Sequence, residues 1–185
     1  MVATRIMCAL TSAASACVFA AQAAPPVLPF AAAGTVQYAF APGDHIDAMI
    51  IAAIDEAQRQ VLVQAYSFTH RRIADALVRA RRRGVEVAVI VDAEQVRGEP
   101  GVLRELARGG VPVRFDTKHA AAHNKIMIVD SGMDSCAVIT GSFNFTYAAQ
   151  QRNAENALVL RGNPPLCEAY YNNWRRHYTH ASSRR

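Results

Sequence analysis

The segment HNKIMIVD, residues 123–130, places an imidazole and an ammonium group two positions apart at the start of an apolar run. Side chains alternate between the two faces of a β-strand, so His123 and Lys125 are predicted to point together, with Asp130 on the opposite face. A neutral imidazole can act as a nucleophile, and a nearby ammonium can bind an anion. The pair therefore indicates chemistry on an anionic substrate.

A second polar group follows in the segment GSFNFT, residues 141–146. Ser142 and Asn144 share one strand parity, so we expect a hydroxyl and a carboxamide on the same side. Gly141 could let the backbone come close to a ligand there. Glu155 then precedes another apolar run and adds a carboxylate.

Phosphodiester chemistry can use each of these groups. The imidazole of His123 can attack phosphorus, while Lys125 and Asn144 can hold the equatorial oxygens as charge shifts. A carboxylate such as Glu155 can fix the imidazole tautomer. No cluster of carboxylates is required, so the pattern favours a phosphodiesterase that needs no metal and no cofactor.

The three segments, in this order, resemble the His-x-Lys-x4-Asp motif of the phospholipase D superfamily, followed by its Gly-Ser-x-Asn and Glu elements. The upstream segments VLVQAYSFT and RRGVEVAVIVD are also similar to that family, so the resemblance extends from Thr35 to Leu160. It implies a covalent phosphohistidine on His123. It also implies that Glu155, helped by Ser142, holds an imidazole.

The same resemblance implies that Lys125 and Asn144 bind the non-bridging oxygens. Asp130 belongs to the motif, but its strand parity directs it away from His123. We therefore expect Asp130 to support the structure and rank it below the other site residues.

The motif occurs once, whereas many members of the family carry it twice and use two histidines. The 162 residues that follow position 23 leave no room for a second half. The resemblance therefore implies a homodimer with one shared site, as in the small exported bacterial endonucleases of this superfamily, because a two-fold axis supplies a second His123. That second His123 would act as the general acid and then activate water.

The first residues have the layout of an export signal. A basic start at Arg5 precedes an apolar stretch, and the triplet Ala21-Gln22-Ala23 suits cleavage before Ala24. The apolar stretch is shorter than the roughly 20 residues of a membrane span, although a retained anchor and lipidation at Cys17 stay open as alternatives. We expect a signal peptide at 1–23, a leader at 24–34, one catalytic domain at 35–180 and a basic tail at 181–185. The protein is thus expected in the periplasm or secreted, with no stable membrane span.

Charge and cysteine content bear on the partner and the compartment. Loss of residues 1–23 would leave 19 basic and 15 acidic residues, a net charge of +4, which favours a polyanionic partner. Cys136 and Cys167 would remain, and in an exported protein they could form a disulfide. Two buried free thiols are the alternative, because sequence separation does not give the distance between them.

Hydrophobic periodicity alternates between strand and helix in the first two thirds of the chain, which indicates βαβ units and a partly parallel sheet. The fold class predicted is α/β, an α-β-α sandwich around a mixed sheet. Asp44 is the expected N-cap of the first helix, and Gly84 is the expected stop of the second. Expected strands are 35–40, 60–68, 85–92, 111–115, 125–130, 137–140 and 156–160; expected helices are 46–57, 71–84, 101–110 and 164–180.

Two features allow a competing interpretation. His119 and His123 have the i, i+4 spacing of a metal pair on a helix, although a third ligand is not obvious. An arginine-rich helix, residues 71–83, could either follow a phosphate backbone or form a solvated face, and the solvated face is slightly favoured.

The function that fits best is endonuclease activity on DNA, with RNA as a further candidate and little sequence preference, since no base-reading motif is present. A phospholipase D or transphosphatidylase acting on lipid phosphodiesters is the alternative. A nucleic-acid-binding module without catalysis is a third possibility, which the complete set of site residues argues against.

Overall fold

The computed structural model describes residues 29, 31–95 and 100–183. The predicted signal peptide at 1–23 and most of the predicted leader lie outside the described residues. Within the described part of the chain, no helix is both long enough and apolar enough to cross a membrane. Residues from Ala31 onward form one compact unit, and all of the elements below belong to it.

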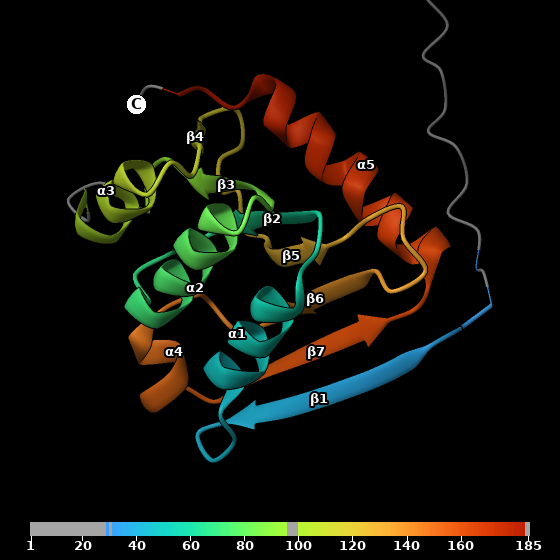
Figure 1. Ribbon diagram of the computed structural model, residues 1–185. Helices are drawn as coiled ribbons and strands as arrows, with labels where there is room; N and C mark the ends of the chain where they lie inside the picture. The colour runs from blue at the N-terminus through green and yellow to red at the C-terminus, as the bar shows by residue number, and fades with distance from the viewer. Residues whose placement is uncertain (1–28, 30, 96–99, 184–185) are drawn as a thin grey trace, which may run out of the picture. The chain divides into compact units, whose positions relative to one another are not determined.

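Strands and helices alternate along the first half of this unit, as the periodicity predicted (Figure 1). The second half is richer in strands and closes with a long helix. The strands are β1 (Thr35–Ala41), β2 (Gln60–Ala65), β3 (Glu86–Asp92), β4 (Val113–Asp116), β5 (Lys125–Val129), β6 (Ala137–Gly141) and β7 (Glu155–Arg161). The helices are α1 (Ile46–Glu56), α2 (Arg71–Arg82), α3 (Pro100–Arg108), α4 (Tyr147–Gln151) and α5 (Pro164–His180).

The strands form one seven-stranded sheet in the order β1-β7-β6-β5-β2-β3-β4. The pairs β2/β3 and β3/β4 are parallel, and the other four pairs are antiparallel. The parallel part is the part with crossover helices, because a parallel connection must return to the same end of the sheet. The predicted mixed α/β sheet with flanking helices is therefore confirmed.

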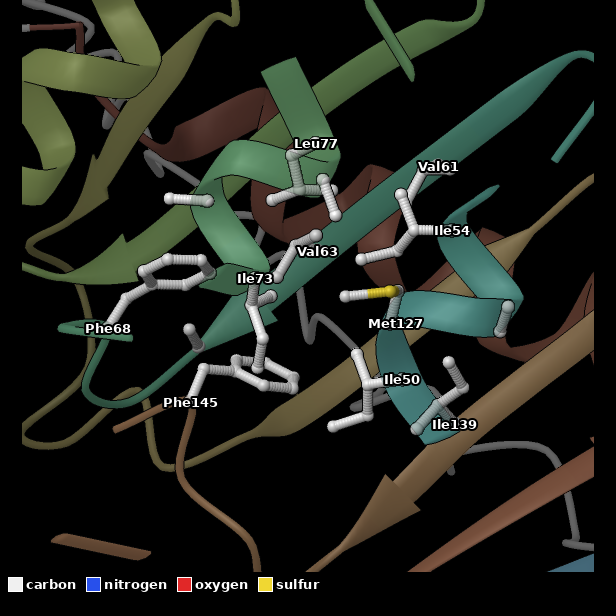
Figure 2. Close-up of a cluster of buried hydrophobic side chains, with 14 of the residues drawn as sticks. Ile50, Ile54, Val61, Val63, Phe68, Ile73, Leu77, Met127, Ile139 and Phe145 are labelled. Carbon is white, nitrogen blue, oxygen red and sulfur yellow. The ribbon is translucent and has the colours of Figure 1, made fainter. Parts of the chain in front are cut away.

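One face of the sheet packs against α1 and α2. Ile50 and Ile54 of α1 and Ile73 and Leu77 of α2 are fully buried in a cluster with Met127 of β5 and other strand residues (Figure 2). Apolar residues recur along both helices at helical spacing, so each helix buries one stripe. This core fixes the face of β5 that carries Met127, which by strand parity is also the face of Lys125.

The other face is covered by α5. Trp174 packs with Leu62, Ile90 and Ile128, and its indole Nε1 donates to the carbonyl of Val63 at 3.0 Å. A buried indole N–H that finds a partner avoids the cost of an unsatisfied donor. The helix is thus fixed to the middle of the sheet.

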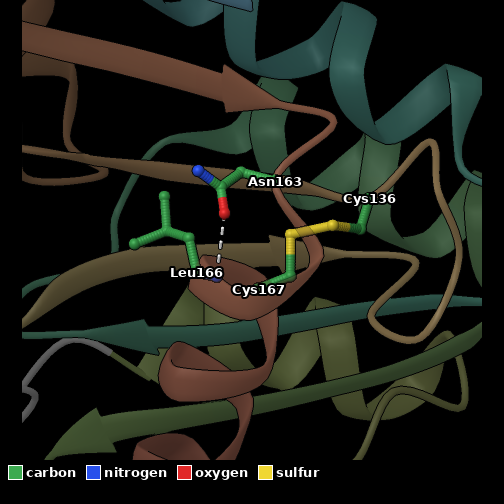
Figure 3. Close-up of a disulfide and its surroundings, with 4 residues drawn as sticks. All are labelled: Cys136, Asn163, Leu166 and Cys167. Carbon is green, nitrogen blue, oxygen red and sulfur yellow. Dashed lines mark hydrogen bonds between the residues drawn. A yellow bond between two sulfur atoms is a disulfide. The ribbon is translucent and has the colours of Figure 1, made fainter. Parts of the chain in front are cut away.

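A disulfide holds the first turn of α5. Cys136, directly before β6, bonds to Cys167, and both are fully buried (Figure 3). Asn163 caps the helix by accepting from the backbone N–H of Leu166 at 3.2 Å. Of the two alternatives left by the sequence, the structure has the bonded pair.

The expected stop of the second helix is confirmed, because Gly84 directly follows the C-cap Arg83 and has a φ of +93°. Two details differ from the sequence predictions. The N-cap of α1 is His45, because Asp44 turns back and accepts from the N–H of Phe40 at 2.9 Å. The short helix α4 was not predicted, because its few residues carry no periodicity to detect.

The arginines of residues 71–83 spread over neighbouring elements instead of converging. They contact α1, α3 and the turn after α3, which fits the interpretation of this helix side as a solvated face. The contacts are Arg71 to Glu105, Arg72 to Asp47, Arg79 to Asp55, Arg81 to the Gly110 carbonyl and Arg83 to the Ile54 carbonyl.

Candidate active site

Three strand ends gather the predicted site residues. β5 begins at Lys125, the antiparallel neighbour β6 ends at Gly141, and β7 begins at Glu155, antiparallel to β6. Adjacent antiparallel strands put the start of one beside the end of the next. Segments 30 residues apart in sequence therefore meet at one end of the sheet.

His123 and Lys125 contact each other, as strand parity predicted. The Lys125 Nζ lies 3.2 Å from Nδ1 and 3.3 Å from Nε2 of the imidazole, and it donates to the His123 carbonyl at 3.0 Å. The ring of Tyr66 stacks obliquely on the imidazole with centroids 4.3 Å apart, and its face lies 4.9 Å from the Nζ. His123 itself is exposed, so the imidazole is accessible to a substrate.

The electrostatics of Lys125 follow from partial burial. Burial lowers the pKa of Lys125, while the negative charge of Glu155 acts against that shift and raises it. The carboxylate on β7 thus lies close enough to influence the ammonium on β5, two strands away in the sheet. An ammonium with reduced hydration binds a phosphate oxygen at a smaller desolvation cost.

A hydrogen-bonded group stands on the other side of the site. Ser142 Oγ donates to Glu155 Oε2 at 2.6 Å and accepts from the backbone N–H of Asn156 at 3.0 Å. The Asn153 amide donates to the second carboxylate oxygen, Oε1, at 3.0 Å. The carboxylate is thereby held in one orientation, while the described contacts of Glu155 do not include the imidazole of its own chain.

Gly141 is required for a reason other than the one predicted. Its φ is +153°, and a Cβ there would collide with the carbonyl oxygen of Asn156. The close approach that Gly141 permits is therefore to β7 and not to a ligand. It lets the Asn156 carbonyl accept from the N–H groups of Ser142 and Phe143 at 3.1 and 3.2 Å.

Asn144 brings a carboxamide with spare hydrogen-bonding capacity to the same loop. Its backbone carbonyl accepts from the N–H of Thr146 at 2.6 Å, which fixes the turn before α4. Its side-chain Oδ1 is buried and has no hydrogen-bond partner in the described part of the chain. Buried polar atoms without partners are uncommon and need an explanation. A ligand or a water bound beside the carboxamide would supply one.

Asp130 lies at the opposite end of β5 from His123 and is almost fully buried. Its carboxylate accepts from the backbone N–H groups of Gln58, Arg59 and Gln60 at 2.7 to 3.2 Å. Its φ of +51° belongs to the left-handed region, which aspartate tolerates better than most residues. Asp130 thus fixes the turn between α1 and β2, and its contacts are those of structural support.

Comparison with known proteins matches this arrangement to a family. A family model described as "Cardiolipin synthase, PLD-like domain" matches residues 50–178, a stretch that contains β5, β6, β7 and every predicted site residue. The chain belongs to the phospholipase D superfamily. As a member of this superfamily, it is a phosphodiester hydrolase.

Two groups of relatives show how far the similarity extends. A phospholipase D of Rickettsia conorii is 37% identical over 139 residues, covering 75% of this chain and 67% of the relative. A mitochondrial cardiolipin hydrolase of Xenopus laevis is 35% identical over 103 residues, covering 56% of this chain and 47% of the relative. The chain thus spans about two thirds of the first protein and about half of the second.

Solved structures of the superfamily superpose on the same unit. Nuc from Salmonella typhimurium, described as a phospholipase D family member, gives a TM-score of 0.75 at 35% identity and covers 80% of this chain and 95% of its own. NucT from Helicobacter pylori gives a TM-score of 0.67 at 22% identity over 80% and 98% of the two chains, and supports the fold alone.

Sequence reasoning missed Tyr66 and misplaced one histidine. Tyr66 follows β2, and its N–H donates to the Asn124 carbonyl at 2.7 Å, but nothing in the sequence indicates that β2 pairs with β5. The alternative of a metal pair formed by His119 and His123 on one helix is wrong, because residues 117–124 form no helix. His119 contacts Asp116, and His123 contacts Lys125.

The phospholipase D motif thus supplies one imidazole to this site. All six histidines of the chain are described, and the other five have different surroundings. His45 is exposed at the start of α1, His70 is 3.5 Å from Asp47, and the remaining three surround Asp116. A reaction that needs two imidazoles at phosphorus therefore needs a second chain.

Proposed function

We propose that this phospholipase D superfamily member is a metal-independent endonuclease that hydrolyses DNA through a phosphohistidine. RNA is a further substrate to test. The observation that carries the proposal is the contact of His123 with Lys125 at the sheet end, beside the Ser142–Glu155 pair. This arrangement offers a nucleophile, a cation and an oriented carboxylate for transfer of a phosphodiester without a metal, and a second imidazole completes it.

In the first step, an unprotonated ring nitrogen of His123 attacks phosphorus, a nitrogen–phosphorus bond forms, and the bond to the leaving oxygen breaks. His123 of the partner subunit gives its proton to that oxygen. Lys125 Nζ and the side-chain NH₂ group of Asn144 donate to the non-bridging oxygens as negative charge develops on them. In the second step, water attacks the same phosphorus after losing a proton to the partner's His123, and the nitrogen–phosphorus bond breaks.

The homodimer is part of this proposal. One chain presents one catalytic imidazole, and a two-fold axis through the site would bring a second without additional sequence. Glu155 would then orient the imidazole of the partner subunit, because its described contacts are to Ser142 and Asn153 and not to its own His123. The exposed position of His123 leaves room for a facing chain.

A nucleic acid suits the charge of the protein. The whole chain has 20 basic and 15 acidic residues, and no base-reading motif was found, so recognition of the phosphate backbone is favoured. The second candidate substrate is a phospholipid, and a specific observation favours it: relatives at 35 to 37% identity are named phospholipase D and mitochondrial cardiolipin hydrolase. The two substrates share the phosphodiester and differ in what binds beside it.

The test uses plasmid DNA in excess EDTA, with wild-type protein, His123→Ala and the matched control His45→Ala, whose histidine is exposed at the start of α1. We expect cleavage by the wild type and the control, and none by His123→Ala. Circular dichroism in EDTA establishes that each protein is folded. Folded wild type that cleaves only after Mg²⁺ is added would overturn the metal-independent mechanism.

Parallel reactions with cardiolipin and phosphatidylcholine vesicles separate the two substrate classes. Binding to DNA releases counterions, so nuclease activity should fall steeply as salt rises. Hydrolysis of phosphatidylcholine, whose surface has no net charge, should change little with salt. Lipid hydrolysis that depends on His123, without DNA cleavage, would assign the site to phospholipids.

The shared site is tested by exchanging subunits between wild type and His123→Ala. If both imidazoles of a dimer act in one site, only dimers of two wild-type chains are active. An equal mixture then keeps about one quarter of the wild-type activity at the same total concentration, against about one half for independent sites. One half would contradict the shared site and leave the role of His123 intact.

A further inference from the structure

A cluster of four side chains lies outside the catalytic site. Asp116 ends β4, His119 is in the loop after it, and His177 and His180 are in the last turns of α5. One potential ligand atom from each residue can be chosen so that all four lie within 4.8 Å of one another. The proposed phosphodiesterase mechanism uses none of these residues.

The distances from the Asp116 carboxylate to the three imidazoles suit a metal site. Asp116 Oδ2 lies 3.1 Å from His119 Nδ1, 3.1 Å from His177 Nδ1 and 3.1 Å from His180 Nε2. Four ligands at Zn–N and Zn–O distances of about 2.0 to 2.1 Å in a tetrahedron are separated from one another by about 3.3 Å. The observed separations from the carboxylate oxygen differ from this value by only a few tenths of an ångström.

The three imidazoles converge on one carboxylate group. Oδ2 of Asp116 faces His177 Nδ1, His180 Nε2 and His119 Nδ1 at the same distance, and His119 Nδ1 is also 3.1 Å from Oδ1. The other oxygen, Oδ1, already accepts from the N–H of Lys118 at 3.0 Å. A cation at the centre satisfies all three nitrogens and Oδ2 together.

The three imidazoles surround a common point. The ring centroids are 4.9 Å apart for His119 and His177, 5.2 Å for His119 and His180, and 5.2 Å for His177 and His180. The Asp116 side chain is fully buried, while 41% of His119 and 23% of His180 remain exposed. The centre is therefore enclosed on the protein side and open to an ion arriving from solvent.

We propose that Asp116, His119, His177 and His180 bind one Zn²⁺ ion in a closed, tetrahedral structural site. Three imidazoles and one carboxylate oxygen complete the coordination that structural zinc prefers. The pair His177 and His180 is at i, i+3 on α5 and so presents both rings on one side of the helix. The site leaves no position for a reacting water, so its role is to join parts of the fold.

One of the segments that the ion joins is the loop that leads to the catalytic histidine. The site ties the end of α5 to edge strand β4 and fixes the loop that runs from β4 to His123. The same loop is held a second time at Ala122, whose N–H donates to Asp92 Oδ2 at 2.7 Å. The ion and Asp92 therefore anchor both sides of a short segment that ends at the catalytic imidazole.

The test measures metal on protein expressed from the full-length gene with a histidine-free affinity tag. After dialysis against zinc and then against metal-free buffer, we expect about one zinc per chain by mass spectrometry in the wild type and in the control His45→Ala. His177→Ala and His119→Ala should bind zinc about 100-fold more weakly or worse. Loss of a residue that only hydrogen-bonds a metal ligand already lowers metal affinity by up to about 100-fold.

A second measurement needs no variant. Cobalt(II) added to metal-free wild type should give the strong visible absorption of a tetrahedral site, and zinc should displace it at one equivalent. Absence of that absorption in folded protein, or zinc affinity in His177→Ala equal to that of the wild type, would reduce the cluster to a hydrogen-bond network and overturn the proposal. Both readouts need no substrate, so they remain valid if the nuclease proposal fails.

Discussion

The disulfide offers a quantitative test of how the sheet and α5 are joined. Cys136 and Cys167 are both fully buried and are separated by 31 residues. The bridge fixes the first turn of α5, which carries the proposed zinc ligands at its other end. Replacing both cysteines by alanine removes the covalent link and leaves the surrounding elements unchanged.

The loop length sets the size of the effect. Closing a loop of 31 residues lowers the entropy of the unfolded chain by about 12 cal/mol/K, which is about 3.7 kcal/mol at 25 °C. In a domain of this size, about 2 to 4 °C of melting temperature is lost per kcal/mol. The double alanine variant should therefore melt about 7 to 15 °C below the oxidised wild type.

Urea denaturation followed by Trp174 fluorescence measures the difference in the free energy of unfolding, because the single tryptophan packs its side chain between α5 and the sheet. Wild type reduced with a thiol is the matched control, since it lacks the bridge but keeps both sulfur atoms. A difference below about 1 kcal/mol between oxidised and reduced wild type would refute the entropy reasoning. It would mean that α5 stays ordered in the unfolded chain or that the bridge strains the fold.

Three further changes test other parts of the structure. Asp130→Ala leaves several backbone N–H groups without their acceptor and should lower the free energy of unfolding by about 3 kcal/mol in urea titrations. Normal stability together with a lower kcat would contradict the structural role of Asp130. Ser142→Ala frees the Glu155 carboxylate and should reduce kcat about 10-fold to 100-fold in steady-state assays, with stability little changed. Burial lowers the pKa of His70, and the negative charge of Asp47 opposes that shift. The imidazole therefore binds a proton more readily in the unfolded chain, so the free energy of unfolding should fall as pH drops from about 7 to about 5. His70→Gln should make the urea midpoint less dependent on pH over this range.

Much of the fold could be predicted because its signals are local. The apolar stripes of α1 and α2 and the continuous apolar run of β3 are readable within single segments, and so is the parity that brings His123 and Lys125 together. These inferences need only the spacing of neighbouring residues. The family was predicted from a resemblance, which rests on the order of the three motifs between His123 and Glu155.

The remainder depends on contacts between distant segments. Tyr66 reaches the imidazole only because β2 pairs with β5, and Gly141 is required by the carbonyl of Asn156. The histidine cluster joins Asp116 to His177, which is 61 positions away, so spacing within the sequence pairs His119 with His123 instead of with His177. Register and helix docking decide such contacts, and a single sequence does not contain them in readable form.

The most direct test of the account is capture of the covalent intermediate. An oligonucleotide labelled at both ends is mixed with wild-type protein, quenched in alkali within the first turnover, and the peptides are mapped by mass spectrometry. The account predicts a nucleotide fragment on the peptide containing His123, stable to alkali and released by acid, and absent from the His123→Ala protein. Turnover by the wild type with no adduct on His123, or with an adduct on another residue, would contradict it.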